Sequence, residues 1–179
     1  MLTVKRILPV IALLFVIGAK AQNSKDTTLR SILLNQLKST HNQAEWFVPV
    51  NNALQDLTLA QATWKPSDSS HSIAQLATHL LFWNKEELNK FNGIKNPDFS
   101  GNNEETFSNP DETKWKAAIK ELDEVLTGWE KAVTEADEAK LQKWYNIIAH
   151  IGTHNAYHTG QIIYIRKQQG SWNPEKGVK

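Results

Sequence analysis

Residues 139–169 read AKLQKWYNIIAHIGTHNAYHTGQIIYIRKQQ, and this stretch decides the fold. Its apolar residues recur at steps of three and four, which is the period of a helix with one buried face. They are Trp144, Ile147, Ile148, Ile151, Ile162 and Ile165. Arg166 and Lys167 suit the last turn of such a helix, and Gly170 suits the position just beyond it. The pattern therefore predicts one long helix over residues 139–169.

Two histidines, His154 and His158, fall on the apolar face of this predicted helix, where Leu or Ile would be expected. Side chains four residues apart on a helix point the same way, so both imidazoles face inward. A buried imidazole without partners costs about 1–3 kcal/mol per unsatisfied group. One explanation is an ordinary hydrogen bond for each ring, in the core or at the rim of the protein. The other is a divalent metal ion held between them, with a third ligand from a neighbouring helix.

His79 is the candidate third ligand, because it is the one histidine inside the second long predicted helix. This helix begins after Ser72, which forms a capping box with Gln75, and it ends at Gly93. A helical bundle can bring the middle of this helix opposite the histidine pair. Three imidazoles leave a coordination position open for water or substrate, as in catalytic metal sites. The predicted metal ligands are therefore His79, His154 and His158.

The other histidines and Glu86 are less suitable metal ligands because of their positions in the predicted helices and loops. His150, one turn before His154, either ligates the ion or hydrogen-bonds beside it, but its position has rotated toward the edge of the apolar face. His71 is expected at the surface or in a loop, and His41 falls in the polar part of the first helix, so neither is included. Glu86, two turns beyond the candidate third ligand, either reaches the site or is solvated, and the second interpretation is favoured.

Aromatic residues and glycines near the trio indicate a pocket. Trp83 and Tyr157 are adjacent to predicted ligand positions and are candidates for its walls. Gly152 and Gly160 each cost about 1 kcal/mol against Ala inside a helix, which indicates close helix approach or space for a substrate. Most of the tryptophans are expected in the core, at positions 64, 83, 115, 129 and 144.

The rest of the chain also indicates helices. We expect a first helix from residue 27 to about residue 47, and a short helical turn within residues 53–64 followed by a loop. Residues 96–109 lack periodicity and are expected to form the longest loop. Pro110 suits the first position of a third long helix, with apolar positions Trp115, Ile119, Leu122, Val125, Leu126, Trp129 and Val133. No segment has the alternation of a strand, so the sequence predicts an all-α antiparallel four-helix bundle.

The N-terminus is typical of a secretory signal peptide over residues 1–21. Lys5 and Arg6 precede an apolar run of about a dozen residues, and Ala19-Lys20-Ala21 is a small-x-small cleavage site. The run is too short for a membrane span of about 20 residues, although an uncleaved anchor is the alternative. Residues 22–179 then form a single domain, expected in the periplasm or outside the cell and free of the membrane.

Composition excludes several classes of function. The chain contains 20 basic and 19 acidic residues and no cysteine. Removing residues 1–21 takes away three basic residues and no acidic ones, which leaves a net charge of about −2. A chain without a basic stripe is not expected to bind nucleic acid. Without cysteine, the exported protein has neither disulfides nor a thiolate nucleophile.

Three blocks of this sequence resemble the DinB/YfiT-like superfamily of metalloenzymes. They are residues 62–66, ATWKP, residues 71–80, HSIAQLATHL, and residues 154–162, HNAYHTGQI, together with Arg166. The resemblance implies an up-down-down-up four-helix bundle with one long crossover, and a zinc or nickel ion held by His79, His154 and His158. Homodimers are common in that superfamily. Its members include thiol-dependent transferases and isomerases, and hydrolase-like proteins, whereas an export signal takes this chain away from cytosolic thiol cofactors.

These observations lead to three hypotheses of different classes. The first is a metal-dependent enzyme that carries out hydrolysis or group transfer on a small molecule at the open coordination position. The second is a non-catalytic helical bundle that binds a metal or a ligand. The third is a plain helical domain whose histidines are satisfied by local hydrogen bonds.

Overall fold

The computed structural model describes residues 27–178, and this part of the chain is all-helical, without a strand. Four helices are long: α1 (Leu29–His41), α4 (Ile73–Phe91), α5 (Glu112–Glu135) and α6 (Glu138–Gln168). The short elements are α2 (Val50–Leu54), α3 (Leu59–Thr63) and the 3₁₀ turns η1 (Asn103–Thr106) and η2 (Pro174–Lys176). The predicted all-α class is confirmed, while the predicted signal peptide over residues 1–21 lies outside the described residues.

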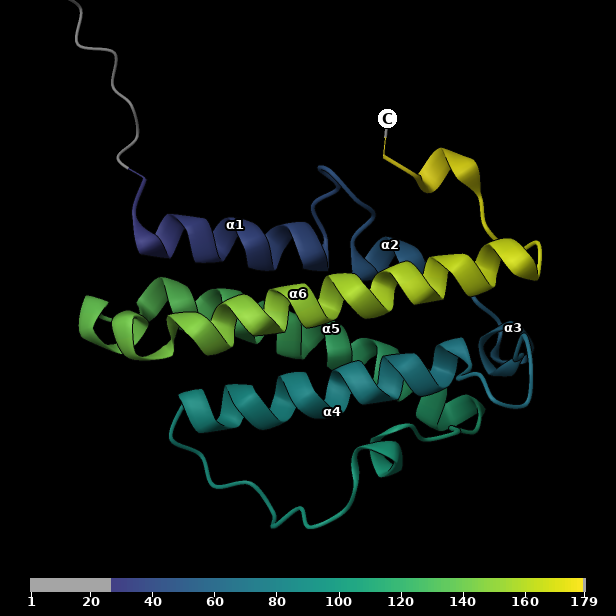
Figure 1. Cartoon of the computed structure of the whole chain (residues 1–179), viewed down its shortest axis with the longest axis horizontal. Coiled ribbons are helices and arrows are strands. Elements are labelled where there is room, and N and C mark those ends of the chain that lie inside the picture. Colours follow the sequence, from purple (N-terminus) through teal and green to yellow (C-terminus); the bar gives the residue numbers. More distant parts are fainter. Residues whose placement is uncertain (1–26, 179) are drawn as a thin grey trace, which may run out of the picture.

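The four long helices lie along the length of the molecule (Figure 1). Helices α4 and α1 each pack against both α5 and α6. The short α2 packs on α6, α3 packs on α4, and η1 also contacts α4. This arrangement makes α4 and α6, the two helices that contain the predicted metal ligands, direct neighbours. No helix within residues 27–178 has the length and apolar character needed to cross a membrane.

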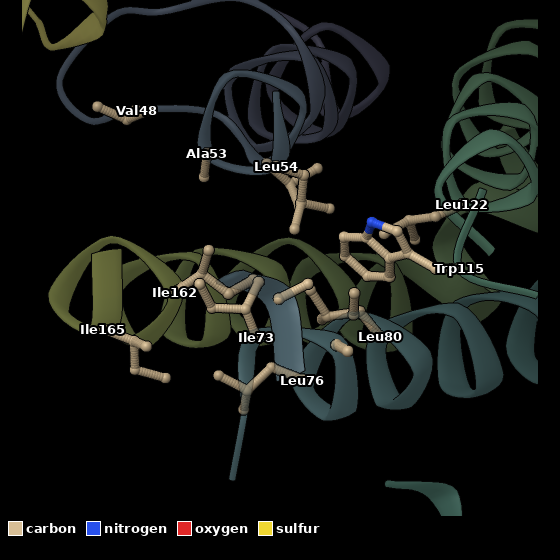
Figure 2. Packing of buried hydrophobic residues seen from close by; sticks show 14 of the residues in the cluster. Val48, Ala53, Leu54, Ile73, Leu76, Leu80, Trp115, Leu122, Ile162 and Ile165 are labelled. Atoms are coloured by element: carbon tan, nitrogen blue, oxygen red, sulfur yellow. The ribbon is translucent and has the colours of Figure 1, made fainter. Parts of the chain in front are cut away.

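The apolar core consists of two clusters at different heights along the helices. Figure 2 shows the first cluster, in which Ile73 and Leu80 of α4 meet Ile162 of α6 beneath the short α2 helix. The second cluster joins residues of α1, α4, α5 and α6: Leu33, Leu37, Leu88, Phe91, Trp129, Val133, Leu141, Ile148 and Ile151. Between the clusters, Asn84 and Asn155 form a buried polar layer.

Local signals determine where α4 and α6 begin and end. The side chain of Ser72 accepts a hydrogen bond from the backbone N–H of Gln75, and the side-chain oxygen of Gln75 accepts one from the backbone N–H of Ser72, so the predicted capping box is confirmed. Gly93 follows α4 with φ 73°, and Gly170 follows α6 with φ 72°, a conformation that only glycine adopts at little cost. The predicted bounds of α6 are correct to within one residue.

The first helix is shorter than predicted. It ends at His41 instead of about residue 47, because Asn42 leaves the helical conformation with φ −145°. Ala44 and Phe47 seemed to extend the apolar face, but both are exposed in the loop, where Trp46 is 93 % exposed. The apparent periodicity beyond His41 therefore arose from loop residues.

Other boundaries also differ from the prediction. Residues 50–63 form two short helices instead of one turn, separated at Asp56, which has φ 59°. Pro110 lies before the third long helix and not in it, because Asp111 is the N-cap and accepts from the backbone N–H of Lys114. Trp64 was expected in the core but is 40 % exposed.

The two glycines of α6 have different surroundings. A Cβ at Gly152 would lie 2.8 Å from Cγ of Gln36, so the expected close approach of helices is present there, between α6 and α1. A Cβ at Gly160 would meet nothing within 4 Å, so this glycine faces open space. Close packing therefore explains Gly152 alone.

Candidate metal centre

Three imidazoles meet where α4 and α6 lie side by side. His79 comes from α4, and His154 and His158 come from consecutive turns of α6. One ring nitrogen of each lies within 4.8 Å of the other two, and no other such group of His, Asp or Glu occurs within residues 27–178. His79 and His158 are buried and His154 is half-buried. The structure brings the predicted trio together, and its role as a ligand set stays a prediction.

His79 makes a hydrogen bond on the side of its ring that faces away from the other two histidines, and this bond determines its tautomer. Nδ1 of His79 lies 2.5 Å from the hydroxyl oxygen of Thr106. That hydroxyl donates its own proton to the carbonyl oxygen of Asn103 at 2.6 Å, so it accepts from His79. Nδ1 of His79 therefore bears the proton, and the lone pair of Nε2 points toward the other imidazoles.

His158 is held in the same way. Its Nδ1 lies 2.6 Å from the side-chain carbonyl oxygen of Gln161, one turn further along α6. This oxygen can only accept, so Nδ1 donates and Nε2 of His158 has a free lone pair. Hydrogen bonds of this kind, from the ring nitrogen that faces away from the centre, orient histidine ligands in metalloproteins and fix their tautomer.

The donor set fits a divalent transition metal. Nε2 of His79 and Nε2 of His154 lie 3.1 Å apart, a distance at which two lone pairs repel unless a proton or a cation lies between them. Three imidazole nitrogens without oxygen ligands suit zinc or nickel and do not suit magnesium or calcium. The residues present therefore match the type of ion that the sequence predicts.

Burial keeps these imidazoles neutral. Burial and the neighbouring imidazoles lower the pKa of His79 from 6.5 to about 3. Burial and His158 lower the pKa of His154 to about 4. Burial also lowers the pKa of His158, although the hydrogen bond with Gln161 acts in the opposite direction. Near pH 7 all three rings are in the neutral form that metal binding requires.

The loop between α4 and α5 closes one side of the site. Phe107 is stacked between His71 and His79, with ring centroids 3.8 and 4.0 Å away and interplanar angles of 4° and 5°. The same loop provides Asn103, which accepts a hydrogen bond from Nε1 of Trp83 at 3.1 Å. Sequence reasoning missed these contacts, because a segment without periodicity does not indicate which of its residues face a helix.

A pair of buried amides links α4 and α6 next to the trio. Asn84 donates to Asn155 at 2.7 Å, and Asn155 donates back at 3.2 Å. Asn84 also donates to the carbonyl oxygen of Leu80, and its own carbonyl oxygen accepts from Trp129 of α5. Both bonds between the two amides are lost if α4 slides along α6. The pair therefore fixes the position of His79 relative to its two partners.

A cleft of about 620 Å³ opens beside the three histidines. Trp83 and Tyr157 line it, which confirms their expected place in the walls of a pocket. His150 also lines the cleft but lies outside the group of three nitrogens that come together. Glu86 lies outside the cleft and pairs with Lys90 at 3.3 Å. Its neighbour, Glu87, lines the cleft instead, and sequence reasoning missed this acid.

His71 and His41, which were not predicted to bind the metal, both have specific contacts in the structure. His71 precedes α4 in a loop, as expected, but it also lines the cleft through its stack on Phe107. His41 is buried and not on a polar face, since its Nδ1 lies 2.6 Å from Glu130 and its Nε2 lies 2.8 Å from Asp123. Both partners belong to α5, so only the folded arrangement reveals them.

Comparison with known proteins agrees with the helical fold and the histidine trio. The family model of the DinB superfamily matches residues 50–162, a range that includes all three histidines. The chain therefore belongs to the DinB superfamily. Neither the curated proteins nor the solved structures include a match to it.

Proposed function

We propose that this chain is a metal-dependent enzyme of the DinB superfamily, in which His79, His154 and His158 bind one divalent ion. The observation that supports this most directly is the pair of Nε2 atoms 3.1 Å apart, with the Nδ1 proton of His79 directed away toward Thr106. A neutral, buried and oriented imidazole cluster is costly unless it has a ligand. Zinc or nickel is the proposed ion, because imidazole nitrogen is the donor atom.

The proposed fold is the DinB-type bundle, antiparallel and up-down-down-up, with one long crossover. The packing of α4 and α1 against both α5 and α6 supports this topology. In such a bundle, ligand and metal sites are built from side chains on facing helices. The trio on α4 and α6 agrees with that rule.

The proposed chemistry is hydrolysis or group transfer on a small molecule. When bound, the ion would supply Lewis acidity toward a water, a thiol or a carbonyl group of the substrate. The three imidazoles bring one ring nitrogen each to within 4.8 Å of the others, and no fourth protein ligand within residues 27–178 joins them. Phe107 covers His79 on one side and limits the access of water there. The cleft beside the trio gives a substrate its approach.

A second candidate function is a metal- or ligand-binding protein without catalysis. One observation favours it: of the cleft-lining residues in the described part of the chain, Glu87 is the one carboxylate, and it lies two helical turns from His79. No carboxylate is therefore beside the trio to act as a general base. The other titratable groups that line the cleft are His71, His150 and Tyr157, and none of them is a carboxylate.

We further propose that the protein acts outside the cytoplasm, in the periplasm or as a secreted protein, and forms a homodimer. The signal-peptide pattern of residues 1–21 supports export. The dimer rests on the family resemblance. The near-neutral charge supports a small-molecule substrate over nucleic acid.

Metal analysis and probe binding test the proposal. We expect one equivalent of zinc or nickel in protein purified from the compartment to which it is exported, and displacement of the ion by chelators. Cobalt-substituted protein should change its visible spectrum when imidazole or a thiol is added, because a position is open. Protein without stoichiometric metal would contradict the proposal. A bound ion whose spectrum does not respond to the probes would favour the second candidate.

A further inference from the structure

The cleft beside the trio extends along α4 and α6, away from the histidines. Glu87 lies eight residues after His79 on α4, which corresponds to about 12 Å along the helix axis. On α6 the residues that line the same cleft include Ile147 and Ile151, which precede His154 by one to two turns. One end of the cleft therefore contains the three imidazoles, and the other end contains Glu87.

The walls between these two ends are mainly apolar, and His150 of α6 is the polar side chain among them. Trp83 lies one turn before Glu87 on α4, and its indole N–H is already bonded to Asn103. Ile147 and Ile151 come from α6 on the opposite side. These side chains offer no free hydrogen-bond donor or acceptor to a ligand. The middle of the cleft therefore suits a chain of methylene groups or another apolar body.

Glu87 is the carboxylate of the far end, toward which His150 also lines the cleft. In the described part of the chain it is the one acidic residue that lines the cleft, and neither Lys nor Arg lines it. Its side chain is 21 % exposed, so a charge that meets it is only partly screened by water.

The existing partner of Glu87 does not block it. Lys90 lies 2.9 Å from Glu87 and 3.3 Å from Glu86, so this ammonium group has a second carboxylate and does not line the cleft. A carboxylate has about four lone-pair sites, which leaves room for a donor from the cleft. Glu87 can therefore bind a ligand cation while Lys90 stays paired.

We infer that the cleft selects elongated ligands with three parts: a metal-binding head at the trio, an apolar body along Trp83, and a cationic amino group at Glu87. This inference depends on the proposed function, because the head requires an ion at the three histidines. The substrate class is therefore an amine long enough to reach from the trio toward Glu87, whose backbone lies about 12 Å along α4 from that of His79. A charge-assisted hydrogen bond to Glu87 provides the selection.

The test compares two probes on the full chain loaded with zinc. They are 6-aminohexanohydroxamate and 6-hydroxyhexanohydroxamate, which share the metal-binding head and the chain length and differ in the charge of the tail. Isothermal titration should give about fivefold tighter binding of the amine, because charged hydrogen bonds exceed neutral ones. The preference should shrink at high salt. A shorter amine, 3-aminopropanohydroxamate, should show no gain over its own hydroxyl analogue.

Two matched variants locate the effect. E87Q should abolish the preference for the amine, so that the two probes bind with equal affinity. E86Q is the matched control, because it also removes one negative charge and one partner of Lys90 but lies outside the cleft. It should keep the tighter binding of the amine probe. Metal content and thermal unfolding, measured for each variant, exclude loss of the ion or of the fold as the cause.

The outcomes separate this inference from the proposed function. Equal binding of both probes to the wild-type chain, or an equal loss in E86Q and E87Q, would overturn the inference and leave the metal centre intact. Zinc bound at the trio without binding of either probe would overturn the open coordination position and the inference with it. Failure of the chain to bind zinc would overturn both proposals.

Discussion

The protein buries histidine in two places, and the two differ in what surrounds the imidazoles. At the trio, His79 and His158 donate Nδ1 protons to neutral oxygens, which leaves Nε2 of each ring without a proton. At His41, both ring nitrogens face carboxylates, Glu130 and Asp123. Each nitrogen of His41 is therefore occupied by a carboxylate, and neither faces another imidazole with which it could share a metal. The hydrogen-bond partners of a buried histidine, and not its burial alone, therefore indicate its role.

The largest expected effect is the loss of metal from the trio. H79A, H154A and H158A each remove one of three ligands, so zinc affinity should fall more than about 100-fold, beyond the effect of losing a supporting hydrogen bond. Plasma mass spectrometry of the purified variants measures the metal, and circular dichroism checks the helices. H41A is the control, and it should retain the metal. If H41A lost the metal while its helices stayed intact, metal binding could not be assigned to the trio alone.

The next effect belongs to His41 and concerns stability. H41A leaves a cavity and removes the imidazole to which Glu130 and Asp123 are bonded, so the free energy of unfolding should fall by about 2 kcal/mol. Part of the usual penalty is relieved because the side chain of Asp123 is 52 % exposed. Urea denaturation followed by circular dichroism measures the change. An unchanged urea midpoint would show that His41 does not contribute to the stability of the fold.

A smaller effect should follow from weakening the orientation of His79. T106V removes the hydroxyl that accepts from Nδ1 and keeps the shape of the side chain, so zinc affinity should fall about tenfold. T153V is the matched control, because the hydroxyl of Thr153 bonds only to carbonyl oxygens of its own helix. Competition with a chromophoric chelator measures both affinities. Equal affinities of the two variants would show that Thr106 does not orient the ligand.

The smallest effect is a difference in pH dependence between the two places, measured on metal-free protein. The folded pKa values of His79 and His154, about 3 and about 4, lie below the ordinary 6.5, so the unfolded chain binds more protons in this range. Stability that is present above pH 6.5 should therefore be lost as the pH falls from 6.5 toward 4. Urea midpoints across this range should fall less steeply in H154A than in the wild type.

The His41 network should respond at lower pH. Hydrogen bonds from Asn51 and His41 lower the pKa of Asp123 below its ordinary 3.8, so its contribution is present above that value and lost only below it. D123N should therefore alter the urea midpoints below about pH 4 and leave the slope between pH 6.5 and pH 4 in place. If D123N changed the urea midpoints only between pH 6.5 and pH 4, the loss of stability in that range would belong to Asp123 and not to the trio.

Much of the fold and the meeting of the trio followed from periodicity, and the exceptions have physical reasons. His154 and His158 were identifiable because a helix of 31 residues places its inward face unambiguously. Thr106 and Phe107 were not, since they reach His79 from a loop whose path depends on tertiary contacts. His41 was missed because its partners are 82 and 89 residues away. The end of α1 was missed because loop residues happened to continue its pattern.

The bonds between Asn84 and Asn155 have a consequence for how an ion arrives. Since these amides hold α4 and α6 together without help from the imidazoles, the fold by itself brings the three proposed ligands together. Little of the affinity is then consumed by ordering the backbone, in contrast to zinc fingers, which fold only with their ion. The scaffold should tolerate exchange of one cation for another, and even replacement of the ligating side chains, while keeping its architecture.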